Sequence, residues 1–151
     1  MRTEAAKGDV ELDVFREFAR RGPLVIDPGS CEKSLPPAPD VLCVVQGEGR
    51  VAFELVELCD PSLAQLISRG AEAEGVYLRT SDPSLAVLSK KLRKRYQSPF
   101  PVELLCFSGR AVSPDSTVIA TLRPLLRSRT FQYRRVWFLG RKAVHQLWPV
   151  G

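Results

Sequence analysis

Hydrophobic and polar positions follow two different periods along this chain. A helical period over residues 10–21 places Leu12, Phe15 and Phe18 on one face, and Gly22-Pro23 ends that helix. Further helices are predicted at 60–75, 81–96 and 116–126, with Pro124 expected to interrupt the last one. Apolar runs rich in β-forming residues predict strands at 41–45, 50–58, 76–79, 102–107, 135–140 and 143–150.

The order of these elements predicts an α/β fold. The strands at 41–45 and 50–58 are joined by the turn "QGEG" and should form an antiparallel hairpin. Strands that are joined through helices tend to be parallel. We therefore expect a mixed β-sheet flanked by helices, in a single domain that spans residues 1–151.

Composition narrows the class of protein. The chain is 44% hydrophobic and 26% charged, as in an ordinary globular protein, and no apolar run approaches the roughly 18 residues that span a bilayer. We expect no membrane contact and, because the N-terminus lacks an apolar leader segment, no signal peptide. The four cysteines form no CxxC pair, so we expect reduced thiols in a cytoplasmic protein and no zinc site.

The basic residues are concentrated in two stretches. Net charge is +5, and the stretch "SKKLRKRY" at 89–96 lies on a predicted amphipathic helix. A second group of arginines lies between residues 123 and 135. Basic groups of this kind suit a polyanion, and a solvated helix face is the alternative interpretation.

Carboxylates lie where a core strand would carry apolar side chains, in "APDVLCVVQGEGRVAFELVEL". Asp40 stands at the start of one hairpin strand and Glu54 towards the end of the other, so the hairpin geometry can bring them together. Two adjacent carboxylates favour a cation between them, and Mg²⁺ needs only one or two of them. Glu57 has the opposite strand parity and joins the site only if the strand is bulged or ends there.

This stretch resembles the core hairpin of the PD-(D/E)xK, restriction-endonuclease-like nuclease superfamily, in its degenerate-motif members. Pro39-Asp40 matches the "PD", Glu54 matches the next acid, and a helix with "KK…K-Y" and the strand "VELLCF" follow. The resemblance implies a restriction-endonuclease-like core and a metal-dependent endonuclease, with Asp40 and Glu54 as Mg²⁺ ligands. It also implies a nucleic-acid partner, DNA ahead of RNA, and allows a homodimer.

The superfamily's lysine is absent from its usual place, which is Val56 here. Lys90, Lys91 or Lys94 of the following helix can stand in, with Lys90 and Lys94 favoured. Glu57 and Glu11 are the assisting acids, with Glu17 as the alternative to Glu11 on the first helix. Lys91, Arg93 and Arg95 are expected to bind the nucleic-acid backbone. Two alternatives stay open: an inactive nuclease-fold module that binds nucleic acid or protein, and an α/β ligand-binding domain unrelated to nucleases.

Overall fold

The computed structural model describes residues 4–58, 83–108 and 114–150 of the chain. Its helices and strands are, in order, α1 (Glu4–Arg21), the short 3₁₀ helix η1 (Pro28–Ser30), β1 (Glu32–Lys33), β2 (Val41–Val45), β3 (Gly49–Leu58), α4 (Pro83–Arg93), β4 (Val102–Ser108), α5 (Asp115–Arg127), β5 (Val136–Leu139) and β6 (Val144–Trp148). The helix expected at 60–75, the strand expected at 76–79 and Cys59 lie outside the described residues.

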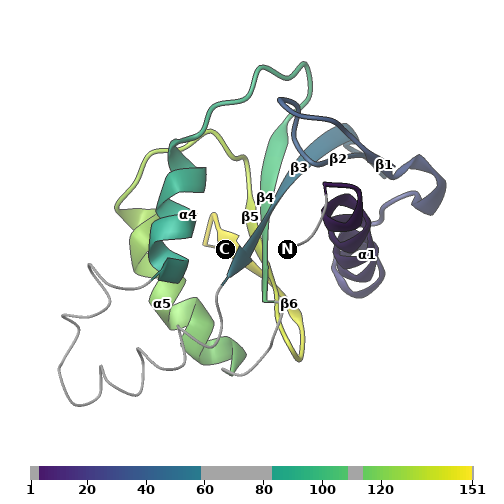
Figure 1. Ribbon diagram of the computed structural model, residues 1–151. Coiled ribbons are helices and arrows are strands. Elements are labelled where there is room, and N and C mark those ends of the chain that lie inside the picture. The colour runs from purple at the N-terminus through teal and green to yellow at the C-terminus, as the bar shows by residue number, and fades with distance from the viewer. Residues whose placement is uncertain (1–3, 59–82, 109–113, 151) are drawn as a thin grey trace, which may run out of the picture.

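The strands form one six-stranded sheet in the order β1-β2-β3-β4-β5-β6. Strand β3 is antiparallel to β2 and parallel to β4, β5 is parallel to β4, and β6 is antiparallel to β5. Helix α1 covers one face of the sheet, while α4 and α5 cover the other (Figure 1). The predicted α/β class and mixed sheet are therefore confirmed, and no helix in the described parts is both long and apolar enough to cross a bilayer.

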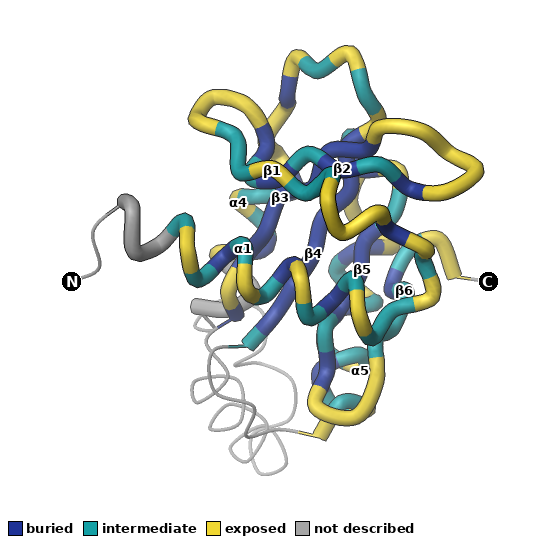
Figure 2. The backbone as a smooth tube through the Cα atoms, turned by 90° about the vertical axis from the view of Figure 1, so that its right-hand side faces the viewer, coloured by how far each residue is buried: buried dark blue, intermediate teal, exposed yellow. Residues whose placement is uncertain are grey.

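Each face of the sheet has its own apolar core. Phe15 and Phe18 of α1 pack on Phe53 of β3 and, through Phe18, on Trp137 of β5. On the opposite face, Leu88 and Leu92 of α4 share a buried cluster with residues of α5 and β4. The central strands β3 and β4 are buried over most of their length, whereas much of the connecting loops is exposed (Figure 2). The central strand β3 therefore has an apolar core packed on each of its two faces.

The predicted hairpin is present with nearly the expected bounds. Gly47 and Gly49 of its turn both have φ of +83°, a backbone conformation that disfavours any residue with a Cβ. The two strands are unequal in length. Pairing of β2 with β3 begins at Val41 opposite Phe53, while β3 runs on to Leu58. Beyond Phe53, β3 therefore pairs with β4 alone among the strands of the described residues.

The structure adds one strand to those predicted and departs from one predicted helix. Glu32 and Lys33, in a segment for which no element was predicted, form the edge strand β1 against Leu42 and Val41 of β2. Helix α5 was expected to be interrupted at Pro124, yet it continues to Arg127. It continues because its buried residues, Val118, Leu122 and Leu126, recur at helical spacing along the core and hold the last turn in place.

Three of the four cysteines lie in the described residues and none of these three forms a disulfide. Cys43 and Cys106 are buried in strands β2 and β4, and burial raises the pKa of each thiol to about 12. Cys31 is only partly buried. These surroundings agree with the expectation of buried reduced thiols for two positions.

A carboxylate that the sequence did not single out is fully buried in the core. Glu103 of β4 is 0% exposed and accepts hydrogen bonds from Arg134, Arg135 and the Trp137 indole. The two arginines also pair with Glu48 of the hairpin turn, each at 2.6 Å. Arg134 and Arg135 belong to the second basic group, so part of that group is committed to internal pairing.

We predict that Glu103→Gln destabilises the fold by about 3 kcal/mol, because it leaves two guanidinium groups without their buried counter-charge. Chemical denaturation of the variant measures this loss. Glu32→Gln, on the exposed edge strand, is the matched control and should change the free energy of unfolding by less than about 0.5 kcal/mol. Equal losses in both variants would contradict the structural role of Glu103.

Candidate functional site

The carboxylate of Asp40 lies beside β3 just beyond Phe53, where no strand of the described residues pairs with β3 on the β2 side. Asp40 immediately precedes β2, and its Oδ2 accepts the backbone N–H of Leu55 at 2.9 Å. Its own backbone N–H donates to Glu54 Oε1 at 3.2 Å. The acid thus satisfies a backbone donor that would otherwise be exposed at the open edge of β3. Asp40 and Glu54 are brought together, as the hairpin geometry predicted.

Glu54 is a buried acid that faces two lysines. Its side chain lies on the α4 face of the sheet and the residue is 3% exposed. Glu54 Oε2 accepts a short hydrogen bond from Lys91 Nζ and lies 3.8 Å from Lys94 Nζ. Residues 91 and 94 are three apart and so lie on the same side of the chain at the end of α4. The buried negative charge is therefore compensated from the helix.

Glu11 reaches the same place from the other face of the sheet. It lies on α1 and is 7% exposed. Lys33 of β1 joins it to Asp40, with its Nζ 2.8 Å from Glu11 Oε1 and 3.2 Å from Asp40 Oδ1. Burial alone would lower the pKa of Lys33, but the two carboxylates raise it above its ordinary value, so the ammonium is charged at neutral pH.

These groups line one cleft of about 550 Å³ at the open edge of β3. Its walls come from α1, the loop after β1, the start of β2, β3 and the end of α4. The lining residues are Gly8, Asp9, Glu11, Leu12, Lys33, Ser34, Leu35, Pro36, Pro37, Ala38, Asp40, Glu54, Lys91 and Lys94. Because β2 begins only at Val41, opposite Phe53, side chains from both faces of the sheet meet in this cleft.

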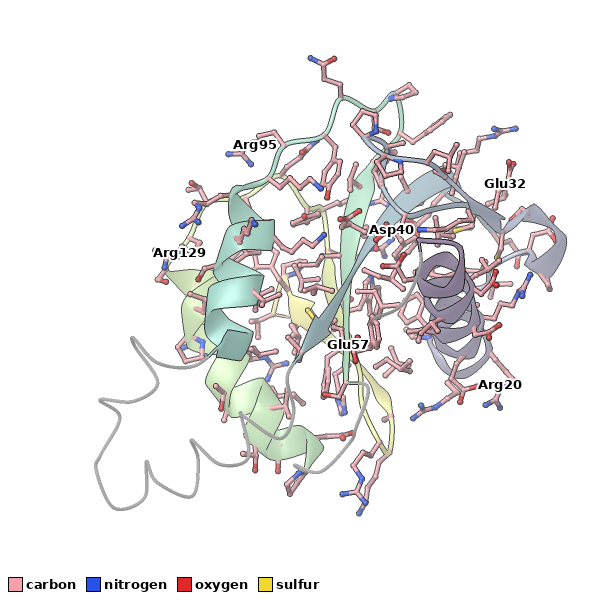
Figure 3. The ribbon with its side chains drawn as sticks, viewed as in Figure 1. Arg20, Glu32, Asp40, Glu57, Arg95 and Arg129 are labelled. Carbon is pink, nitrogen blue, oxygen red and sulfur yellow. The ribbon has the colours of Figure 1, made fainter. Side chains whose placement is uncertain are left out.

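Other predicted site residues lie elsewhere. Lys90 is exposed and does not line the cleft, because it is rotated by about 100° from Lys91 around the helix. Glu57 is exposed near the end of β3, away from Asp40 (Figure 3). Arg93 and Arg95 are exposed at the end of α4, where Arg95 points away from the sheet (Figure 3). Of the predicted site residues, Asp40, Glu54, Glu11, Lys91 and Lys94 therefore line one cleft, and the others do not.

The structure gives a physical reason why position 56 carries an apolar residue and not a lysine. Val56 is 3% exposed and packs in the same apolar cluster as Leu88 and Leu92 of α4. A lysine at position 56 would have to bury its charge beneath that helix. Lys91, on α4 itself, reaches Glu54 from above the core. We had favoured Lys90 over Lys91 as the lysine that acts with Glu54. The buried positions Leu88 and Leu92 instead indicate that Lys91 is the lysine beside the buried face of the helix.

Two tyrosines lie beneath this end of the cleft. The Tyr133 hydroxyl donates to the backbone carbonyl of Lys91 at 3.0 Å. The Tyr96 hydroxyl is buried, and no described residue lies in hydrogen-bonding geometry to it. Burial, aided by the adjacent Glu54 carboxylate and its charge, raises the pKa of Tyr96 well above its ordinary value. The Tyr96 hydroxyl is thus a neutral polar group close to Glu54 and Tyr133, but its hydrogen-bonding geometry to both is poor.

We predict that Tyr96→Phe leaves the free energy of unfolding unchanged or raises it by up to about 1 kcal/mol, because it removes an unsatisfied buried hydroxyl. Tyr133→Phe is the matched control and should lower it by about 1 kcal/mol, because it removes a formed hydrogen bond. Urea denaturation compares the two variants. A loss in Tyr96→Phe as large as that in Tyr133→Phe would mean that the Tyr96 hydroxyl has a partner.

A second polar cluster joins α5 to the β5–β6 turn. Asp115 accepts the backbone N–H groups of Arg141, Lys142 and Ala143, and its Oδ2 lies 2.9 Å from His145 Nε2. A Cβ on Gly140 would come within 2.3 Å of the same carboxylate. The Asp115 carboxylate therefore connects the turn to helix α5. Because both of its oxygens already accept hydrogen bonds, we interpret the cluster as structural. His145 finds its partner in this cluster.

Burial alone would raise the pKa of the Asp115 carboxyl, but the hydrogen bonds from His145 and the three backbone N–H groups hold it below the ordinary value of 3.8. The stabilisation is therefore present above that value and is lost as pH falls through the lower folded-state pKa. We predict that the loss of stability in Asp115→Asn is largest at pH 5 and shrinks progressively below about pH 4. Thermal melts between pH 5 and pH 2 measure it, with the exposed Asp13→Asn as control. A constant difference over this range would contradict the prediction.

No family model, curated protein or solved structure matches this chain in comparisons with known proteins. The described residues also contain no group of three or more His, Cys, Asp or Glu side chains placed to hold a metal ion. The site must therefore be interpreted from its own chemistry.

Proposed function

We propose that this protein is a Mg²⁺-dependent nuclease that hydrolyses nucleic-acid phosphodiesters in the cleft at the open edge of β3. DNA is the expected substrate. The observation that carries the proposal is the convergence of Asp40, Glu54 and Lys91 from a strand start, a neighbouring strand and a helix. These are the residue types of the PD-(D/E)xK motif, with the lysine supplied by the helix. The order α1, β2–β3 hairpin, α4 and β4 also agrees with the resemblance.

The donor set fits Mg²⁺ rather than a metal that needs a protein cage. Asp40 and Glu54 offer hard carboxylate oxygens, each of which has a second lone pair beyond its present hydrogen bond. Mg²⁺ commonly takes one or two carboxylates and keeps several waters, so two acids in an open cleft suffice. When bound, the ion would polarise the phosphodiester and activate a water molecule. The Tyr96 hydroxyl, unpartnered among the described residues, offers a further polar group near Glu54.

The lysines supply the positive charge that the reaction needs. Lys91 contacts Glu54 and can turn its ammonium towards a phosphate in the cleft, where it would stabilise the charge that develops on the phosphorane. Lys94 lies at the rim and is 51% exposed. Arg93 and Arg95 continue the exposed basic surface beyond it and would contact the backbone without reading sequence.

The two walls of the cleft suit the two halves of a nucleotide. Lys91 and Lys94 form a basic wall, while Leu12 and the loop residues 35–38 form an apolar one. Leu35 is 82% exposed, so an apolar side chain is available at this wall. A nucleotide places an anionic phosphate beside a base with a flat aromatic face, so this polarity supports a nucleic-acid substrate.

A second candidate is an inactive nuclease-fold module that binds nucleic acid. The observation that favours it is the internal pairing of the acids. Asp40 and Glu54 are already satisfied by lysines and by backbone N–H groups. Such a module would keep the basic surface around Lys94 and lose hydrolysis. Cleavage assays and binding assays separate the two candidates.

We expect the purified protein to cleave labelled single- and double-stranded DNA with Mg²⁺ or Mn²⁺ and not with EDTA. Asp40→Asn, Glu54→Gln and Lys91→Met should each lower the rate by at least about 100-fold, because each removes a group that acts on the transition state. Asn at position 40 retains an acceptor for the Leu55 N–H. Lys90→Met, which removes an equal charge outside the cleft, is the control and should leave the rate unchanged.

Equal cleavage by wild type and Asp40→Asn would identify a contaminant and refute the proposal. Absence of cleavage on DNA and RNA, together with tight binding, would favour the module. In that case binding should weaken with salt, and neutralising Arg93, Lys94 and Arg95 should reduce the slope of log affinity against log salt by about 1 for each phosphate that the variant no longer neutralises. Neutralising Arg16 and Arg20, two exposed charges on α1 outside the cleft, is the control, and the changes in slope are compared per charge removed.

A further inference from the structure

Lys33 holds the position between two carboxylates that a metal ion would be expected to hold. Its ammonium lies 2.8 Å from Glu11 and 3.2 Å from Asp40, which come from a helix and from the start of a strand. Without a cation, two such acids would repel each other or one would be protonated. The sequence did not identify Lys33, since it lies in a short edge strand outside the motif.

The surrounding structure is shaped to keep Lys33 in place. A Cβ on Gly8 of α1 would lie 3.3 Å from Lys33 Cε, so the helix passes close to the lysine side chain at a residue that has no side chain of its own. The backbone N–H of Ser34 donates to the Asp40 carbonyl at 2.8 Å, which ties the two ends of the loop between Lys33 and Asp40. Lys33 is 28% exposed, so its ammonium can reach solvent if it leaves the pair.

We propose that the Lys33 ammonium fills a cation site formed by Glu11 and Asp40, and that a divalent cation can use this carboxylate pair only when Lys33 is displaced or neutralised. Asp40 is shared between this site and the Asp40–Glu54 pair. Lys33 therefore acts as a resident counter-ion that limits how strongly the cleft attracts divalent cations. This inference rests on the proposed function for the identity of the cation, and its test does not depend on cleavage.

The test is a titration with Mn²⁺ alone, followed by calorimetry and by the electron paramagnetic resonance signal of free Mn²⁺. Lys33→Met and Lys33→Gln should each bind Mn²⁺ at least about tenfold more tightly than wild type, because they leave two carboxylates without a counter-charge. Lys90→Met removes a lysine that lies outside the cleft and should show wild-type affinity. Adding Glu11→Gln to Lys33→Met should abolish the gain.

Affinity in both Lys33 variants equal to or weaker than that of wild type would overturn the inference, as would a gain that survives Glu11→Gln. If Lys33→Met folds poorly, Lys33→Gln decides the matter, since its amide keeps a hydrogen-bond donor for the acids. The two proposals fail separately. A wild-type protein that cleaves nothing, with a gain in Mn²⁺ affinity in the Lys33 variants, refutes the nuclease and supports the cation site. Cleavage by wild type without that gain does the reverse.

Discussion

The whole arrangement depends on the late start of β2, at Val41, beside the longer β3. From Glu54 onward no strand of the described residues lies next to β3 on that side, and an unpaired backbone N–H in a nearly buried place is costly. Asp40 resolves this by placing its carboxylate on the Leu55 N–H. The same bond fixes the acid beside Glu54 at the open edge. One backbone requirement thus determines where two acids meet and where a cleft can form.

The second constraint is charge balance in a place that is largely removed from water. Glu11 and Glu54 are almost fully buried, so each needs a partner, and the partners come from different elements. Lys33 of β1 serves Glu11 and Asp40, while Lys91 of α4 serves Glu54. The cleft is therefore polar and nearly neutral rather than strongly acidic. Any ligand that binds there must replace one partner of these ion pairs. A charged ligand can do this because it supplies a new counter-charge for the buried group whose partner it displaces.

The sequence predicted the parts of this structure that follow from local patterns. Strand β2, the glycine turn and the meeting of Asp40 with Glu54 could be inferred because alternation and turn chemistry are properties of neighbouring residues. Lys33 could not be found in this way, since a strand of two residues has no period to read. Glu103 was missed for a related reason. Its burial depends on Arg134 and Arg135, which lie 31 and 32 residues away, and nothing near residue 103 signals them.

The comparison of Glu103 with Glu54 shows why burial alone does not identify a site. Both acids are buried on central strands and both face two basic residues. Glu103, however, is enclosed by two arginines and the Trp137 indole, whose planar donors use its oxygens fully. Glu54 faces lysines, which are flexible point charges, and borders a cleft open to solvent. An acid held by arginines in the core maintains the fold, whereas an acid held by movable lysines at a cleft can exchange its partner for a ligand. That difference, and not the number of charges, distinguishes Glu54 as the acid at which we propose that the chemistry takes place.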